Sequence, residues 1–315
     1  MLNSGVTSVY EWCQGNRTPD HSDGAIDGLE RSGIRALGIL GPDYSPVEVC
    51  EKGFALATEL ELWSSAHYSG RKGKVDGGYF TLAEKGILGN RHNAVHGNAM
   101  SDEQIKLLID KGNTITATAT TEISGGSKAA LISRVLEAGG TPAIGNDSET
   151  ATAGSMLAAM RESLAIDRLF RNIERDAAAK IDAPAATNAV YCGMPIPPHK
   201  SHDTYDALKW ATIGNARSMG LEHRIGSLEP DKQADIVMIR ANDINLVPSI
   251  DPVDAIVTYA DASNVETVFV NGVARKTGGV LTDASASTAA ATLRERTLRI
   301  LAESGRAAMA EERFN

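Results

Sequence analysis

The sequence has little cysteine, no long apolar run and no excess of basic charge. Its three cysteines are widely spaced and odd in number, which argues against a disulfide framework or a zinc knuckle and predicts reduced thiols in a cytoplasmic protein. No stretch approaches the roughly 18 consecutive apolar residues of a membrane-spanning helix. Acidic residues outnumber basic ones, 40 to 31, for a net charge of −9. Because no basic run exceeds a few residues, neither nucleic acid nor a membrane is an expected partner.

Strand-like and helix-like segments alternate along the first two thirds of the chain. The 315 residues and a hydrophobic content of 42% suffice for one large domain, or for one domain and a smaller one. Glycines directly follow several helix-like segments, as expected for left-handed helix ends. This alternation predicts an α/β fold with a parallel sheet. Six parallel strands are expected, at 6–12, 34–40, 62–67, 93–96, 114–121 and 141–146.

The last third of the chain has a different character. A helix over 204–219 is followed by β-rich runs at 234–239, 255–260 and 265–273, and Asn271-Gly272 is a typical hairpin turn. An alanine-rich amphipathic helix is expected over about 287–313. These features predict two domains, 1–222 with the parallel sheet and 223–315 with a β module and a C-terminal helix.

Three residues with metal-ligating side chains each end a predicted parallel strand. His67 and His96 end consecutive strands, and Asp147 ends the sixth. A capping box, Ser101 with Gln104, starts the helix after His96. The carboxyl ends of parallel strands share one rim, where β/α barrels carry their chemistry. Imidazole and carboxylate ligands suit zinc or iron, which would activate a water molecule. For each residue alone, the alternative is a polar strand end with satisfied hydrogen bonds.

The remaining polar candidates carry weaker signals. Glu122 follows the threonine-rich strand and is a candidate for acid–base work or substrate contact, with a solvated loop carboxylate as the equal alternative. His92 is expected at the opposite end of its strand from His96, in a structural role. His199 and His202 lie in a proline-rich region and are expected to be exposed loop residues and not a ligand pair.

Four segments of the chain carry a resemblance to a known family. They are VHGNAMSDEQ (95–104), LEAGGTPAIGND (136–147), ATIGNARSMGL (211–221) and IGSLEPDKQADIVMI (225–239). With them the chain resembles the amidohydrolase superfamily, in the branch of cytosine-deaminase-like, triazine-hydrolase-like and chlorohydrolase-like enzymes. The third and fourth segments are very specific for the superfamily, although their role is structural, and the resemblance covers almost the whole chain.

The resemblance implies a distorted β/α barrel beside a β-sandwich, with a divalent metal at the strand tips. The metal would activate water to hydrolyse C–N or C–Cl bonds of small molecules, often nitrogen heterocycles. His67 resembles the fifth-strand metal ligand. His96 resembles the sixth-strand histidine, which binds metal or polarises the substrate, and Asp147 the eighth-strand aspartate, which binds metal and accepts the proton of the water. The predicted metal ligands are therefore His67, His96 and Asp147, and the predicted catalytic residues His96, Asp147 and Glu122.

The chain departs from the family pattern in three places. It contains no His-x-His motif, which supplies two metal ligands in relatives. Gly70 stands where many relatives have a proton-shuttling glutamate, and Asn146 where threonine is common. Met1 falls where the family enters its third strand. The fold expected is therefore a β/α barrel of about six strands, incomplete at its N-terminus, with a partial β-sandwich and a C-terminal helix.

Three explanations for the missing portion stay open at this point. The start could be an internal methionine of a longer gene, the chain could be a degenerate relative, or a partner chain could complete the barrel. The function expected is metal-dependent hydrolysis of non-peptide carbon–nitrogen bonds in a small molecule, with an inactive remnant or binding subunit as the alternative. Exposed sheet edges and the amphipathic tail helix also suggest a homo-oligomer, which light scattering would test.

Overall fold

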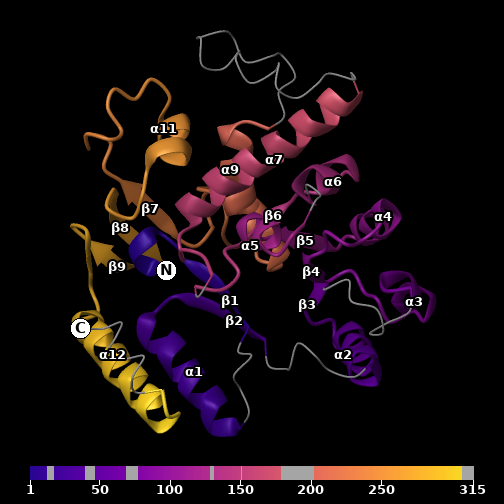
Figure 1. Cartoon of the computed structure of the whole chain (residues 1–315), viewed down its shortest axis with the longest axis horizontal. Helices are drawn as coiled ribbons and strands as arrows, with labels where there is room; N and C mark the ends of the chain where they lie inside the picture. The colour runs from indigo at the N-terminus through magenta and orange to yellow at the C-terminus, as the bar shows by residue number, and fades with distance from the viewer. Residues whose placement is uncertain are drawn as a thin grey trace.

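The elements of the chain are arranged as two parallel sheets and one antiparallel sheet with helices around them (Figure 1). A computed structural model describes residues 1–12, 18–39, 47–68, 77–127, 131–149, 151–178 and 202–306, and every structural statement below concerns these residues. His199 and Gly70 therefore lie outside the described residues. No helix among those described is long and apolar enough to cross a membrane.

The described residues contain six parallel strands, in agreement with the number expected. β1 (Ser8–Trp12) pairs with β2 (Arg35–Ile39). A second parallel sheet contains, in spatial order, β3 (Ser64–Tyr68), β4 (His92–His96), β5 (Thr114–Ala117) and β6 (Ala143–Ile144). Within the described part of the chain no strand pairing joins the two sheets, so the strands do not form a closed barrel.

Helices cover the outer side of the four-stranded sheet. Figure 1 shows α2, α3, α4 and α6 in an arc around β3 to β6. Buried apolar side chains such as Ile105 of α4 and Ile115 of β5 form the core between them. The expected capping box starts α4, because the Ser101 side chain accepts from the Gln104 N–H and the Gln104 side chain accepts from the Ser101 N–H. The helices of this region are α1 (Pro19–Ser32), α2 (Val47–Glu59), α3 (Tyr79–Glu84), α4 (Asp102–Asp110), α5 (Ala119–Ser124), α6 (Leu131–Glu137) and α7 (Met156–Ala178).

Two segments expected as strands contain helices instead. The threonine-rich segment 114–121 is extended only to Ala117, and α5 follows because the Glu122 carboxylate accepts from the backbone N–H of Thr118 at 2.8 Å. The segment 255–260 belongs to α11 (Pro252–Tyr259). Asp251 caps that helix and proline occupies its first turn, which are strong local start signals. In both places a helix start outweighs β-branched composition.

The helix expected over 204–219 is continuous but contains a π turn. It consists of α9 (Thr204–Lys209), η3 (Trp210–Gly214) and α10 (Asn215–Ser218). The widened turn brings this helix against the edge of β6, where the Asn215 side chain accepts from the Ile144 N–H at 2.9 Å. A Cβ at Gly214 would lie 2.3 Å from the Pro142 carbonyl oxygen, so only glycine permits this approach.

The antiparallel sheet contains β7 (Ile236–Ile239), β8 (Val265–Val270), β9 (Val273–Thr277) and β10 (Val280–Leu281), in the order β10-β9-β8-β7. The Asn271-Gly272 hairpin turn between β8 and β9 is confirmed, with positive φ at both residues. Arg35 of β2 is ion-paired with Asp235, next to β7, and so ties the parallel strands to this sheet. The N-terminal η1 (Leu2–Ser4) packs on the sheet, and α12 (Ala286–Glu303) follows it.

Candidate active site at the strand tips

Three aromatic side chains stack at the carboxyl ends of three parallel strands. The rings of Trp12 and His67 are 4.3 Å apart between centroids, and those of His67 and His96 are 5.0 Å apart and nearly parallel, at 14°. Trp12 ends β1, His67 lies near the end of β3 and His96 ends β4. The structure therefore brings two predicted metal ligands together, and it adds a tryptophan that the sequence did not single out.

The contact between the two histidines depends on an unusual backbone conformation. His96 is paired in register with Tyr68, which faces outward and donates a hydrogen bond to Gln104 of α4. A regular strand would place the His96 side chain on that same face. Instead His96 has φ of +69°, and its ring stacks on His67. Left-handed non-glycine residues cost free energy and occur where neighbouring structure enforces them, often at functional sites.

Glu122 lies behind His96 in the first turn of α5 and is only 6% exposed. Its Oε1 atom lies 3.4 Å from His96 Nδ1. The hydroxyl oxygen of Thr118 lies 2.9 Å from the same nitrogen. Of the two alternatives for Glu122, the solvated loop carboxylate is therefore wrong. The side chain contacts His96 and does not extend into solvent.

Asp147 does not end the sixth strand as expected, because β6 ends at Ile144 and Asp147 lies in the loop that follows. It also adopts a left-handed conformation, with φ of +63°, and its side chain is exposed. The neighbouring Asn146 fixes the loop by donating to the carbonyls of Ala153 at 2.8 Å and Ser155 at 3.0 Å. Among the described residues, no group of three His, Cys, Asp or Glu side chains is arranged to hold a metal ion. The donors present thus do not make a complete metal site, and the predicted ligand set stays a prediction.

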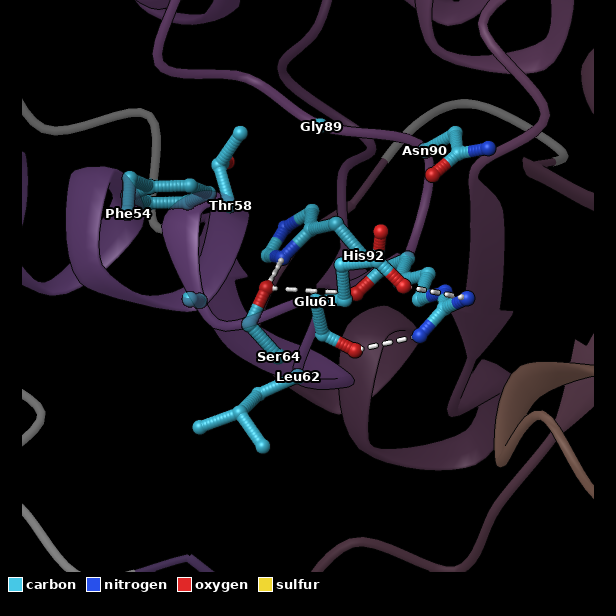
Figure 2. A pocket seen from close by; sticks show the side chains of 10 residues that line it. Phe54, Thr58, Glu61, Leu62, Ser64, Gly89, Asn90 and His92 are labelled. Carbon is cyan, nitrogen blue, oxygen red and sulfur yellow. Dashed lines mark hydrogen bonds and ion pairs between the residues drawn. The ribbon is translucent and has the colours of Figure 1, made fainter.

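A separate pocket of about 230 Å³ lies at the opposite ends of β3 and β4 (Figure 2). His92 is one of the residues that line it, is 1% exposed, and has a pKa lowered to about 3 by burial. Burial also raises the pKa of the Tyr79 phenol, so the phenol stays neutral, and its oxygen lies 2.9 Å from His92 Nε2. His92 Nδ1 lies 2.9 Å from Ser64 Oγ. Both ring nitrogens of His92 therefore have hydrogen-bond partners in the protein interior, which supports its expected structural role.

One histidine expected to be exposed is hydrogen-bonded instead. His202 Nδ1 lies 2.7 Å from the Oδ2 atom of Asp167 in α7, and Asp167 is buried. The expectation for His202 was therefore wrong. A sequence signal existed, because Asp167 continues the helical spacing of the buried residues Met160 and Leu164. A carboxylate on such a stripe requires a partner.

The sequence is similar to known enzymes over most of its length. The model of the Amidohydrolase family matches residues 45–275. The 5-methylthioadenosine/S-adenosylhomocysteine deaminase of Moorella thermoacetica is 26% identical over 279 residues, covering 86% of this chain and 56% of that protein. The corresponding deaminase of Teredinibacter turnerae is 29% identical over 191 residues, covering 61% of this chain and 38% of that protein. The chain thus spans about half, or less, of the length of these relatives.

Solved structures show the same fold at lower identity. A mutant atrazine chlorohydrolase from Arthrobacter aurescens TC1, complexed with zinc and atraton, has a TM-score of 0.73 at 18% identity, covering 92% of this chain and 73% of that one. An adenosine deaminase from Xanthomonas campestris with bound zinc has a TM-score of 0.67 at 20% identity, covering 90% of this chain and 62% of that one. Since the family model matches more than half of its residues, this chain belongs to the amidohydrolase family.

Proposed function

We propose that this chain carries out, or forms part of an enzyme that carries out, the hydrolysis of carbon–nitrogen bonds in a small molecule that contains a flat nitrogen heterocycle. The observation that carries the proposal is the stack of Trp12, His67 and His96 at three strand tips, with the Glu122 carboxylate behind His96. The rim of a parallel sheet at its carboxyl edge is where such enzymes place their substrates.

The fold supports this interpretation. We regard the two parallel sheets as six strands of an incomplete β/α barrel, and the antiparallel sheet as part of the adjoining sandwich. The proposed boundary between the domains lies between residues 222 and 223. The likeness to the two hydrolase structures above extends over nine tenths of the chain, which supports a shared architecture.

The aromatic stack supports a planar substrate. Stacked or tilted ring pairs contribute about 0.5–1.5 kcal/mol beyond the area that they bury. A flat heterocycle beside Trp12 and the two imidazoles would gain this contribution, whereas a flexible aliphatic amide would not. The relatives are named for methylthioadenosine, S-adenosylhomocysteine and adenosine, which all contain an aminopurine ring.

A divalent metal, zinc or iron, remains part of the proposal. Two structural neighbours were crystallised with zinc, and His67, His96 and Asp147 are the predicted ligands in this chain. The described side chains do not form a group of three donors that could hold a metal ion. The proposal assigns roles to two groups of residues. The stacked rings of Trp12, His67 and His96 would contact the substrate, and Thr118 and Glu122 contact His96.

The test combines metal analysis with an assay for released ammonia. The purified chain is incubated with methylthioadenosine, S-adenosylhomocysteine, adenosine, guanine and an aminotriazine, beside a His67→Ala/Asp147→Ala double variant. His223→Ala serves as the matched control, because His223 is exposed and lies far along the chain from the rim residues. We expect near-stoichiometric zinc or iron and ammonia release, both lost in the double variant and kept in the control. No metal in the wild-type chain, or equal ammonia release by the double variant, would refute the proposal that this chain by itself carries out the hydrolysis.

A further inference from the structure

We propose that Thr118 and Glu122 are positioning residues that hold the His96 imidazole with its proton on Nδ1, so that Nε2 is the atom offered at the strand tips. What Nε2 does there rests on the proposed function. The assignment of the proton does not, because it is argued from the hydrogen-bond partners of Nδ1.

The partners of Nδ1 favour one arrangement of protons over the other. An ionised carboxylate can only accept hydrogen bonds, and a hydroxyl can donate one and accept others. The Thr118 hydroxyl lies 2.9 Å from His96 Nδ1 and 3.4 Å from Glu122 Oε1. If Nδ1 held a lone pair, it would face the carboxylate oxygen 3.4 Å away without a proton between them. With the proton on Nδ1, that nitrogen donates to the Thr118 oxygen and the Thr118 hydroxyl donates to Glu122.

The carboxylate is fixed in place by the start of α5. Thr118 is the N-cap residue, and its backbone N–H donates to Glu122 Oε1 at 2.8 Å. Both side chains are nearly buried, with Thr118 at 3% and Glu122 at 6% exposure. A buried carboxylate anchored by a backbone donor cannot rotate away without losing that bond. The same interaction that ends β5 and starts the helix therefore also sets the state of His96.

The arrangement explains why His96 leaves regular strand geometry. With φ of +69° its ring stacks on His67 and its Nδ1 edge faces Thr118. Partners of this kind, which orient a histidine through its second nitrogen, typically change metal affinity or activity 10–100-fold when removed. Thr118 and Glu122 therefore act through His96, and neither needs to touch the substrate.

The proton position can be measured by NMR without any enzymatic activity. In metal-free protein carrying ¹⁵N-labelled histidine at pH 8, long-range ¹H–¹⁵N correlations distinguish protonated from unprotonated ring nitrogens. His96→Gln identifies the signals of that ring among the seven histidines. We expect a protonated Nδ1 and an unprotonated Nε2. A wild-type His96 with its proton on Nε2 would overturn the proposal, whether or not the chain proves to be a hydrolase.

Variants separate this role from general effects on folding. Thr118→Val combined with Glu122→Gln should shift His96 toward the Nε2–H form that free histidine prefers in water, and Thr118→Ser alone should preserve the wild-type signals. Glu162→Gln is the matched control, because Glu162 is a nearby carboxylate whose hydrogen-bond partner is the Thr120 hydroxyl and not His96. An unchanged proton position in a folded double variant would refute the positioning role. Where the chain is active, Glu122→Gln should lower kcat/KM about 10–100-fold.

Discussion

The buried His92 predicts a loss of stability in mild acid. His92 is enclosed by Ser64 and Tyr79, and burial lowers its pKa from 6.5 to about 3. The unfolded chain therefore binds a proton at His92 at a higher pH than the folded chain does. Between pH 6.5 and about 3 the unfolded state carries the extra proton, so the free energy of unfolding falls as the pH falls. The contribution is present in full above pH 6.5.

The size of the effect follows from the difference between the two pKa values. Each pH unit between them is equivalent to about 1.4 kcal/mol. Lowering the pH from 7 to 5 should therefore cost about 2 kcal/mol from His92 alone. His92→Gln cannot titrate but keeps a donor and an acceptor in the same site, so it should lack this part of the pH dependence whatever its own stability at pH 7.

Urea unfolding at pH 7, 6 and 5, followed by circular dichroism, measures this difference. The quantity compared is the change in unfolding free energy between pH 7 and pH 5, which should be about 2 kcal/mol smaller in His92→Gln than in the wild type. His223→Gln, at an exposed position, is the matched control and should behave like the wild type. Equal pH dependence in wild type and His92→Gln would refute the assignment of a buried, neutral histidine.

Three further substitutions test how the sheets and the rim are held. Arg35→Met should cost about 3–5 kcal/mol of unfolding free energy, because it leaves the buried Asp235 carboxylate unpaired, and a second change, Asp235→Asn, should recover most of it. Asn215→Ala should cost about 1–3 kcal/mol in the same assay by leaving the buried Ile144 N–H without its acceptor, whereas Asn215→Asp should not. Asp147→Gly should melt at or above the wild-type temperature and Asp147→Ala below it, because only glycine adopts the positive φ without strain. The reverse order in calorimetry would contradict a left-handed Asp147.

Much of the fold could be predicted because its signals are local. Helix starts and stops lie in short sequence patterns, such as the capping box of Ser101 and Gln104 or the glycine that follows α1. These signals divide the chain into the six parallel strands that the structure contains. The two segments wrongly expected as strands also depend on local signals. Glu122 binds the Thr118 backbone N–H at the start of α5, and Asp251 caps α11, but the strand-forming composition of both segments concealed these helix starts.

The site was predictable only in part, because its geometry depends on contacts between distant segments. Placing His67 and His96 at neighbouring strand tips requires only the alternation of strands and helices. The stacking of Trp12 on His67 requires knowing how β1 lies against the second sheet, which no local pattern specifies. The burial of Asp167 against His202 similarly joins residues 35 positions apart.

His96 and Asp147, the two residues with left-handed backbone conformation at the carboxyl edge of the four-stranded sheet, are evidence that this edge has a function. A strand that only has to end and turn could do so with glycine, which adopts positive φ at no steric cost. At the tip of β4 and in the loop after β6 the chain instead has His96 and Asp147, each in a conformation that costs of the order of 1 kcal/mol for a residue with a side chain. Thr118 and Glu122 hold the first of these side chains, and Asn146 fixes the loop of the second. Strain that is supported by dedicated contacts at two positions along this edge of the sheet favours a rim that binds and transforms a substrate over one that merely closes the fold.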